Sequence, residues 1–221
     1  MTLEALRSFS YSDENLGTIP DSHLGSGGAM SENAQLSLLS PVSDLDLTRD
    51  LLADLHDDLK GKVARFHQLA DLSTVLGAVA TMLPGGEISS FAWSEARTSF
   101  IHGNYVATVL LCQGLAEHVL AGYLSLSMGG GKLPDRISFQ ETLRRCVEES
   151  MIAKEDADDL RRLMGMRNPL SHFRHFDDPA NLSHRVVETM QPAELHLSID
   201  ASFAISVVIR LLALPAFRVD R

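Results

Sequence analysis

Arg167, Asn168 and His172 have the side chains and the spacing that chemistry on a phosphodiester requires. A guanidinium can hold two phosphate oxygens at once, and an imidazole can transfer protons near neutral pH. Asn is a strong N-cap, and proline suits the first position of a helix but disfavours helical geometry in the residue before it. We therefore expect one helix to end near Arg167 and a short new helix to begin at Pro169, with His172 in its first turn.

A helix N-terminus beside Arg167 and His172 would favour a bound anion, because its free N–H groups carry partial positive charge. Metal-independent RNA cleavage needs a base for the ribose 2′-OH, positive charge at the phosphorane and an acid for the leaving 5′ oxygen. In this interpretation His172 is the base or the acid, Arg167 holds the phosphate, and Asn168 fixes the junction. One chain offers one such histidine, although the reaction needs two proton-transfer groups.

The pattern Arg167-Asn168…His172 resembles the R-x4-H signature of HEPN domains, in which it lies at a helix junction. The stretch from Phe100 to Leu120 resembles the long helix of that family, which carries small and apolar residues ahead of an acidic one. The resemblance covers roughly residues 45 to 215. It implies a metal-independent endoribonuclease that acts as a homodimer. The two motifs of the dimer would face one composite cleft. The cleavage products would carry a 2′,3′-cyclic phosphate and a 5′-hydroxyl.

The resemblance also implies a biological setting, a toxin or defence effector that acts on RNA and has an antitoxin protein as a further partner. HEPN toxins paired with minimal nucleotidyltransferases often carry R-x4-H-x-Y. Arg174 occupies the tyrosine position here, which argues against adenylylation at that site. Many HEPN domains are noncatalytic, so a nucleotide-binding or protein-interaction module is the alternative function.

Arg174 and His175 directly follow the motif and are expected to bind substrate, in a small basic pocket that Arg161 and Arg162 would complete. Taken singly, each arginine is better explained as part of a solvated helix surface. Arg167 also has a purely structural alternative, which is an ion pair with a nearby aspartate. The candidate aspartates are Asp158, Asp159 and Asp177.

Glu117 is the third candidate for substrate binding and has two interpretations of equal weight. It would contact the Arg167 region, as the resemblance implies, or occupy an exposed surface position. His172 and His175 would share one face of the motif helix as an HxxH pair. A metal ion would need further ligands beside them, and the sequence identifies none, so we expect neither a metal nor a cofactor.

Composition indicates one globular domain. The chain has 221 residues, 45% of them hydrophobic, and a net charge of −10, which argues against nonspecific coating of nucleic acid. Cys112 and Cys146 stand among apolar residues without metal-site spacing, so we expect buried free thiols and a reducing compartment. No signal-peptide pattern opens the chain, and the run from Phe203 to Pro215 is shorter than the ~20 residues of a membrane span. These features predict a cytoplasmic protein without a membrane partner.

Hydrophobic periodicity predicts an all-α, up-and-down bundle of four to five main helices with a short extra helix that carries the motif. We expect a flexible tail over residues 1–42 and a helical domain over residues 43–221, with a glycine loop at residues 129–131. The expected helices run from near Ser43 toward Met82 with a break at Gly61 or Asp71, from Ser89 or Ser90 past Tyr123, from Ser138 to Met151, from Lys154 to Met166, from Pro169 to Asp177, from Ser183 to Met190 and from Ile199 to Leu214.

Overall fold

The computed structural model of the chain describes residues 43–127, 133–134 and 136–219. They belong to two compact units, one that ends at Leu51 and one that runs from Leu52 onward, and each is described by itself. The predicted flexible tail of residues 1–42 and the predicted glycine loop at residues 129–131 lie outside the described residues.

Helices make up nearly all of the regular structure, so the predicted all-α bundle is confirmed. The elements are α2 (Asp44–His56), α3 (Leu59–Ser73), η2 (Thr74–Leu76), β1 (Ala80–Thr81), α4 (Glu87–His102), α5 (Tyr105–Leu126), α6 (Phe139–Glu148), α7 (Lys154–Ser171), α8 (Leu182–Thr189), α9 (Ala193–Ala213), η3 (Pro215–Phe217) and β2 (Arg218–Val219). The two short strands pair antiparallel, with Ala80 opposite Val219.

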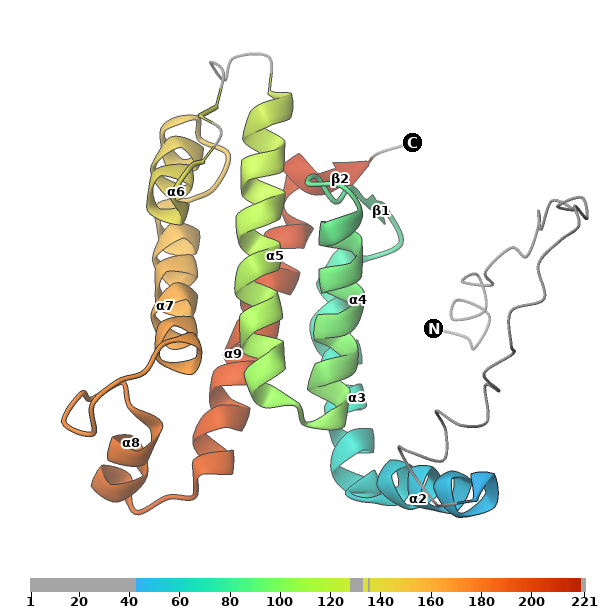
Figure 1. Ribbon diagram of the computed structural model, residues 1–221. Coiled ribbons are helices and arrows are strands. Elements are labelled where there is room, and N and C mark those ends of the chain that lie inside the picture. The colour runs from blue at the N-terminus through green and yellow to red at the C-terminus, as the bar shows by residue number, and fades with distance from the viewer. Residues whose placement is uncertain (1–42, 128–132, 135, 220–221) are drawn as a thin grey trace, which may run out of the picture. The chain divides into compact units, whose positions relative to one another are not determined.

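In the unit from Leu52 onward, α5 is the central helix, and it packs against α4, α6, α7 and α9. Figure 1 shows α4 and α5 as antiparallel neighbours, with α7 on the other side of α5 and α9 behind it. Both α5 and α9 are apolar around most of their circumference, which favours burial. They supply most of the core, including Val109, Cys112, Leu115, Val119, Leu120, Ala204, Ile205, Val208 and Leu212.

The single long helix predicted from Ser89 past Tyr123 is wrong, because the chain forms two helices that meet at Gly103. The φ of Gly103 is 79°, in the left-handed region that glycine adopts at low cost. The N–H groups of Gly103 and Asn104 donate to the carbonyls of Phe100 and Ser99. This Schellman-type ending satisfies the last carbonyls of α4 and lets α5 turn back beside it.

The first predicted helix is also divided, at Asp58 and not at Gly61, and α3 ends at Ser73, close to the expected break at Asp71 and well before Met82. Asp58 adopts a φ of 48°, and its carboxylate accepts a hydrogen bond from the N–H of Gly61, 3.2 Å away. A Cβ on residue 61 would lie 2.3 Å from that carboxylate, so a larger residue there would displace the capping side chain. Arg65 also donates to Asp58 at 2.8 Å, and this hydrogen bond lowers the pKa of the Asp58 carboxyl.

Two polar contacts fasten α8 onto α9. Arg185 on α8 holds both carboxylate oxygens of the buried Asp200 on α9, at 2.6 and 3.1 Å. Thr189 donates its hydroxyl proton to the carbonyl of Arg185, so its oxygen accepts from Nε2 of His196, 2.8 Å away. These contacts fix the far end of the loop that follows α7, which carries the candidate site.

Candidate functional site at the end of α7

The motif lies at the C-terminal end of α7, and the predicted motif helix from Pro169 is wrong. The incoming helix does not stop at Arg167 but continues through Pro169 to Ser171, and His172 is its C-cap. Residues 172–181 then form a loop that leads into α8. A helix C-terminus carries partial negative charge, so the helix itself offers no anion site at this point. Phosphate binding would depend on the side chains alone.

The path of α7 through Pro169 has a packing explanation. Proline removes one hydrogen bond to the carbonyl four residues earlier and crowds it, which here is the carbonyl of Gly165. Gly165 is exposed, so water can satisfy that carbonyl. Met166 and Leu170 on either side of Pro169 pack against the core. The His172 N–H also donates to the Asn168 carbonyl at 3.0 Å, so the final turn closes after the proline.

Arg167 and His172, the two principal candidates, have adjacent side chains. Nη1 of Arg167 lies 3.4 Å from Nε2 of His172, and the histidine is exposed to solvent. A guanidinium can only donate hydrogen bonds, so in this contact Nε2 accepts and the ring proton is on Nδ1. The sequence prediction that these two side chains act in one place is therefore compatible with their geometry, although the helix end is the opposite of the one expected.

Asn168 contributes through its backbone. Its carbonyl accepts from the N–H of His172 at 3.0 Å and from the Ser171 hydroxyl at 3.4 Å. The Ser171 hydroxyl also lies 3.2 Å from the Arg167 carbonyl. Asn168 therefore helps to close the helix that presents Arg167 and His172, but as a residue of the last turn and not as the N-cap of a new helix.

The carboxylates expected as structural partners of Arg167 are engaged elsewhere or make no ion pair with it. Asp158 pairs with Arg161 at 2.5 Å, and Asp159 pairs with Arg210 at 2.5 Å. Among the described residues, no carboxylate lies within ion-pair distance of Arg167, Asp177 included. The guanidinium of Arg167 therefore keeps most of its donors for a ligand.

Arg174 and His175 lie on the loop after the helix, so the predicted HxxH pair on one helix face is wrong. Arg174 makes a long ion pair with Asp178 at 3.5 Å, and its carbonyl accepts from the Asn181 side chain at 2.8 Å. The His175 carbonyl accepts from the N–H of Asp178. Within the described parts of the chain, no three His, Cys, Asp or Glu side chains are grouped as metal ligands would be.

Glu117 is partly buried on α5, where it accepts a hydrogen bond from the buried Gln113 at 3.0 Å. No hydrogen bond or ion pair joins it to Arg167 or His172 among the described residues. It is thus neither a fully exposed surface residue nor a bonded partner of the motif. Among the candidate residues, Arg167, Asn168 and His172 lie together at the C-terminal end of α7. Arg174 and His175 lie on the loop that follows.

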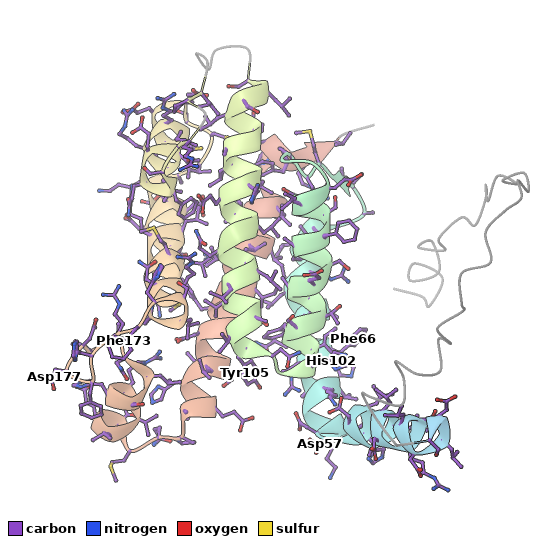
Figure 2. All side chains as sticks on the ribbon, in the orientation of Figure 1. Asp57, Phe66, His102, Tyr105, Phe173 and Asp177 are labelled. Carbon is purple, nitrogen blue, oxygen red and sulfur yellow. The ribbon has the colours of Figure 1, made fainter. Side chains whose placement is uncertain are left out.

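Two exposed aromatic residues, Phe173 and Phe176, stand beside these residues and were not among the predicted site residues. Figure 2 shows Phe173 and Asp177 on the loop between α7 and α8. The side chain of Phe173 is 87% exposed and that of Phe176 is 52% exposed. The sequence signal was present, because a phenylalanine between His172 and Arg174 has polar neighbours on both sides.

Two helices, α5 and α9, are long and apolar enough to cross a membrane by length and composition alone. Both supply the buried core of the unit from Leu52 onward, and a core helix meets the same criteria. No protein-family model matches the sequence, and no curated protein or solved structure matches the chain.

Proposed function

We propose that this chain is a metal-independent endoribonuclease of the HEPN type, which acts as a homodimer with a composite active site. The observation that carries the proposal is the pair of Arg167 and His172, whose side chains lie 3.4 Å apart at an exposed helix end. The absence of a carboxylate partner for Arg167 among the described residues adds support, since an anionic substrate could take that place.

In the proposed reaction, Nε2 of one His172 accepts the proton of a ribose 2′-OH. The 2′ oxygen attacks the phosphorus, and the bond from phosphorus to the 5′ oxygen breaks. The leaving 5′ oxygen takes a proton from a second histidine, which gives a 2′,3′-cyclic phosphate and a 5′-hydroxyl. Arg167 donates to the non-bridging oxygens, where negative charge builds up in the transition state.

The second histidine is proposed to be His172 of another copy of this chain. A shallow, mostly apolar groove along the first turns of α5 supports a place for that copy, because Ala107 and Leu110 line it. It is bordered on one side by Glu95, Thr98 and Ser99 of α4 and on the other by Val106 and by Leu197 of α9. Figure 1 shows the start of α5 and the end of α7 at the same end of the bundle. A two-fold axis at that end would bring two motifs toward one cleft.

The proposal is tested with purified protein and total RNA in excess EDTA. Wild-type protein should cleave RNA and leave 2′,3′-cyclic phosphate ends, which are mapped by ligation-based sequencing. The substitution His172→Ala should remove this activity, and Glu194→Ala on exposed α9 surface is the matched control. Absence of cleavage by the wild type, or equal cleavage by His172→Ala, would refute the enzyme.

A toxin or defence role is part of the same proposal, with cytoplasmic RNA as the target and an antitoxin protein as the partner. Induced expression of the wild-type chain should then arrest growth, and expression of His172→Ala should not. Growth arrest that is equal for the two chains would contradict a role for RNA cleavage in toxicity.

A noncatalytic nucleotide-binding or protein-interaction module is the second candidate, and one observation favours it. The Nε2 atom of His172 already contacts Arg167 of its own chain, so this nitrogen has a partner without substrate. The net charge of −10 also limits general affinity for RNA. Nucleotide binding without any cleavage, lost in Arg167→Ala, would identify the module.

A further inference from the structure

The exposure of Phe173 has no structural explanation within its own unit. A phenylalanine ring in water forgoes the free energy of burial, yet 87% of this side chain is accessible. Its aromatic neighbour is His175, in a T-shaped arrangement with ring centroids 5.5 Å apart. One edge-to-face contact occupies at most one face of the ring, so the other face can receive a planar ligand.

The loop that carries Phe173 is held by hydrogen bonds at both ends. At its start, the His172 N–H donates to the Asn168 carbonyl. At its end, the Asn181 side chain donates to the Arg174 carbonyl at 2.8 Å and accepts from the N–H of Ser183 at 2.8 Å. The ring is thus presented by a supported turn, which lowers the entropy that a ligand must overcome on binding.

The groups around Phe173 fit a ligand with an aromatic face and a negative charge. From Arg167 to Phe176, the chain carries two arginines and two histidines and no carboxylate, and the first acidic residue is Asp177. Phe176 is a second accessible ring on this loop, and the residues directly next to Phe173 are His172 and Arg174, whose side chains can meet a phosphate. A nucleotide supplies both features, because its base stacks and its phosphate is anionic.

We propose that Phe173 is a base-stacking residue that binds an unpaired nucleobase one or two nucleotides from the scissile phosphate. The Cα atoms of consecutive residues are about 3.8 Å apart, so Phe173 and His172 lie within reach of the same short stretch of RNA. His172 has extended backbone dihedrals, which direct its side chain and that of Phe173 to different sides. The RNA would pass over the loop, with the phosphate at Arg167 and the base on Phe173.

This inference rests on the proposed function only for the position of the phosphate, so binding and cleavage are measured separately. The binding probe is a single-stranded 2′-O-methyl oligonucleotide, which lacks the attacking hydroxyl. The reporter is Phe173→Trp in a Trp93→Phe background, since Trp93 is the one native tryptophan. Base stacking should quench the new tryptophan, whereas an oligonucleotide with abasic sites of equal length should quench it far less.

In cleavage, Phe173→Ala should lower kcat/KM on single-stranded RNA by about 10-fold or more and weaken the base preference beside the cut. Phe173→Tyr should retain most activity, because the stacking face is preserved. The matched control is Phe91→Ala on α4, which removes another exposed phenylalanine ring, 65% accessible, and should leave cleavage unchanged.

The outcomes separate the two proposals. Quenching without any cleavage by the wild type would refute the nuclease and retain Phe173 as a stacking residue. Cleavage that is unaffected by Phe173→Ala, or quenching that is equal for the abasic probe, would refute the stacking residue and retain the nuclease. Loss of self-association in Phe173→Ala, measured by light scattering, would instead identify the ring as an interface residue and overturn the inference.

Discussion

At the scale of single residues, the contact between Arg167 and His172 has two consequences. It holds the exposed imidazole at a defined place at the end of α7, and it occupies the nitrogen that would act as a base. A phosphate that takes the donors of Arg167 would release Nε2 of His172 for the ribose hydroxyl. Binding of the substrate phosphate and activation of His172 as a base would then occur in one step.

The two cysteines should be inert in the folded protein. Burial raises the pKa of Cys146 to about 12, with a smaller contribution from the charge of Glu149. Burial also raises the pKa of Cys112 well above its ordinary value. Since the thiolate is the reactive form, we expect no reaction with a thiol reagent such as DTNB at pH 8 in native buffer and two reacting thiols per chain in guanidinium. Rapid labelling of the native chain would contradict this burial.

Glu141 on α6 should contribute to stability in a defined pH range. Hydrogen bonds from Arg144 and Arg145 lower its pKa from 4.5 to about 2. The folded pKa lies below the unfolded one, so this stabilisation is complete above about pH 4.5 and is lost as the pH falls toward 2. Urea midpoints measured between pH 6 and 2 should fall less steeply for Glu141→Gln than for the wild type. Glu87→Gln on exposed α4 surface is the control, and an equal slope for Glu141→Gln would contradict the prediction.

At the scale of elements, Pro169 lies inside the last turns of α7, where a proline destabilises the helix. Proline in a helix interior is about 3 kcal/mol less favourable than alanine, and less near the helix end. Pro169→Ala should therefore raise the free energy of unfolding by about 1–2 kcal/mol in urea titrations. Gly165→Ala is the companion change, because a Cβ there meets no atom within 4 Å. It should add about 0.5–1 kcal/mol. A loss of stability in Pro169→Ala would show that the proline sets the helix path.

The ion pair between Arg185 and Asp200 should be the main link between α8 and α9. Asp200 is 4% exposed, so removal of its partner leaves a buried charge without compensation. We expect Arg185→Ala to lower the free energy of unfolding by about 2–3 kcal/mol. The exposed pair of Arg210 and Asp159 provides the control, since Asp159→Ala should cost less than about 1 kcal/mol. Equal losses for the two variants would show that α8 is held mainly by apolar contacts.

At the scale of the whole molecule, apolar periodicity was sufficient to predict the helical class. The helix starts expected near Ser43 and at Ser138 agree with the structure, in which the hydroxyls of these serines accept from the N–H groups of Asp46 and Glu141. The helix boundaries were harder to predict because tertiary contacts decided them. Pro169 indicated a new helix, but packing of the neighbouring Leu170 against the core kept α7 continuous. Gly103 stands between His102 and Asn104, with apolar runs on either side, and that it ends a helix becomes evident only from its left-handed φ in the folded chain. Arg167 and His172 were predicted to lie together at a helix junction. Their contact arises because His172 leaves the helix with extended dihedrals, since residues five apart within a continuous helix point in different directions.

The proposed composite site makes a prediction about chains that are inactive alone. Each dimer of Arg167→Ala lacks both phosphate clamps, and each dimer of His172→Ala lacks both proton-transfer groups. Random association of the two would place about half of the chains in mixed dimers, which have one Arg167 and one His172 from different subunits. If the shared cleft can run on one Arg167 and one His172 from different subunits, the mixture should regain part of the wild-type cleavage. If both His172 side chains are needed, as in the two-histidine reaction above, the mixture should stay inactive.

Dimerisation itself provides the control for this experiment. Leu110→Asp would place a charge in the apolar groove of α5, and it should yield monomers by light scattering and remove cleavage without loss of helical circular dichroism. Arg167→Ala should remain dimeric, because Arg167 lies outside the groove and outside the core. A monomer that cleaves RNA at micromolar concentration would overturn the composite site. Such a result would require both proton transfers within one chain, where His175 is the nearest second histidine in sequence to His172.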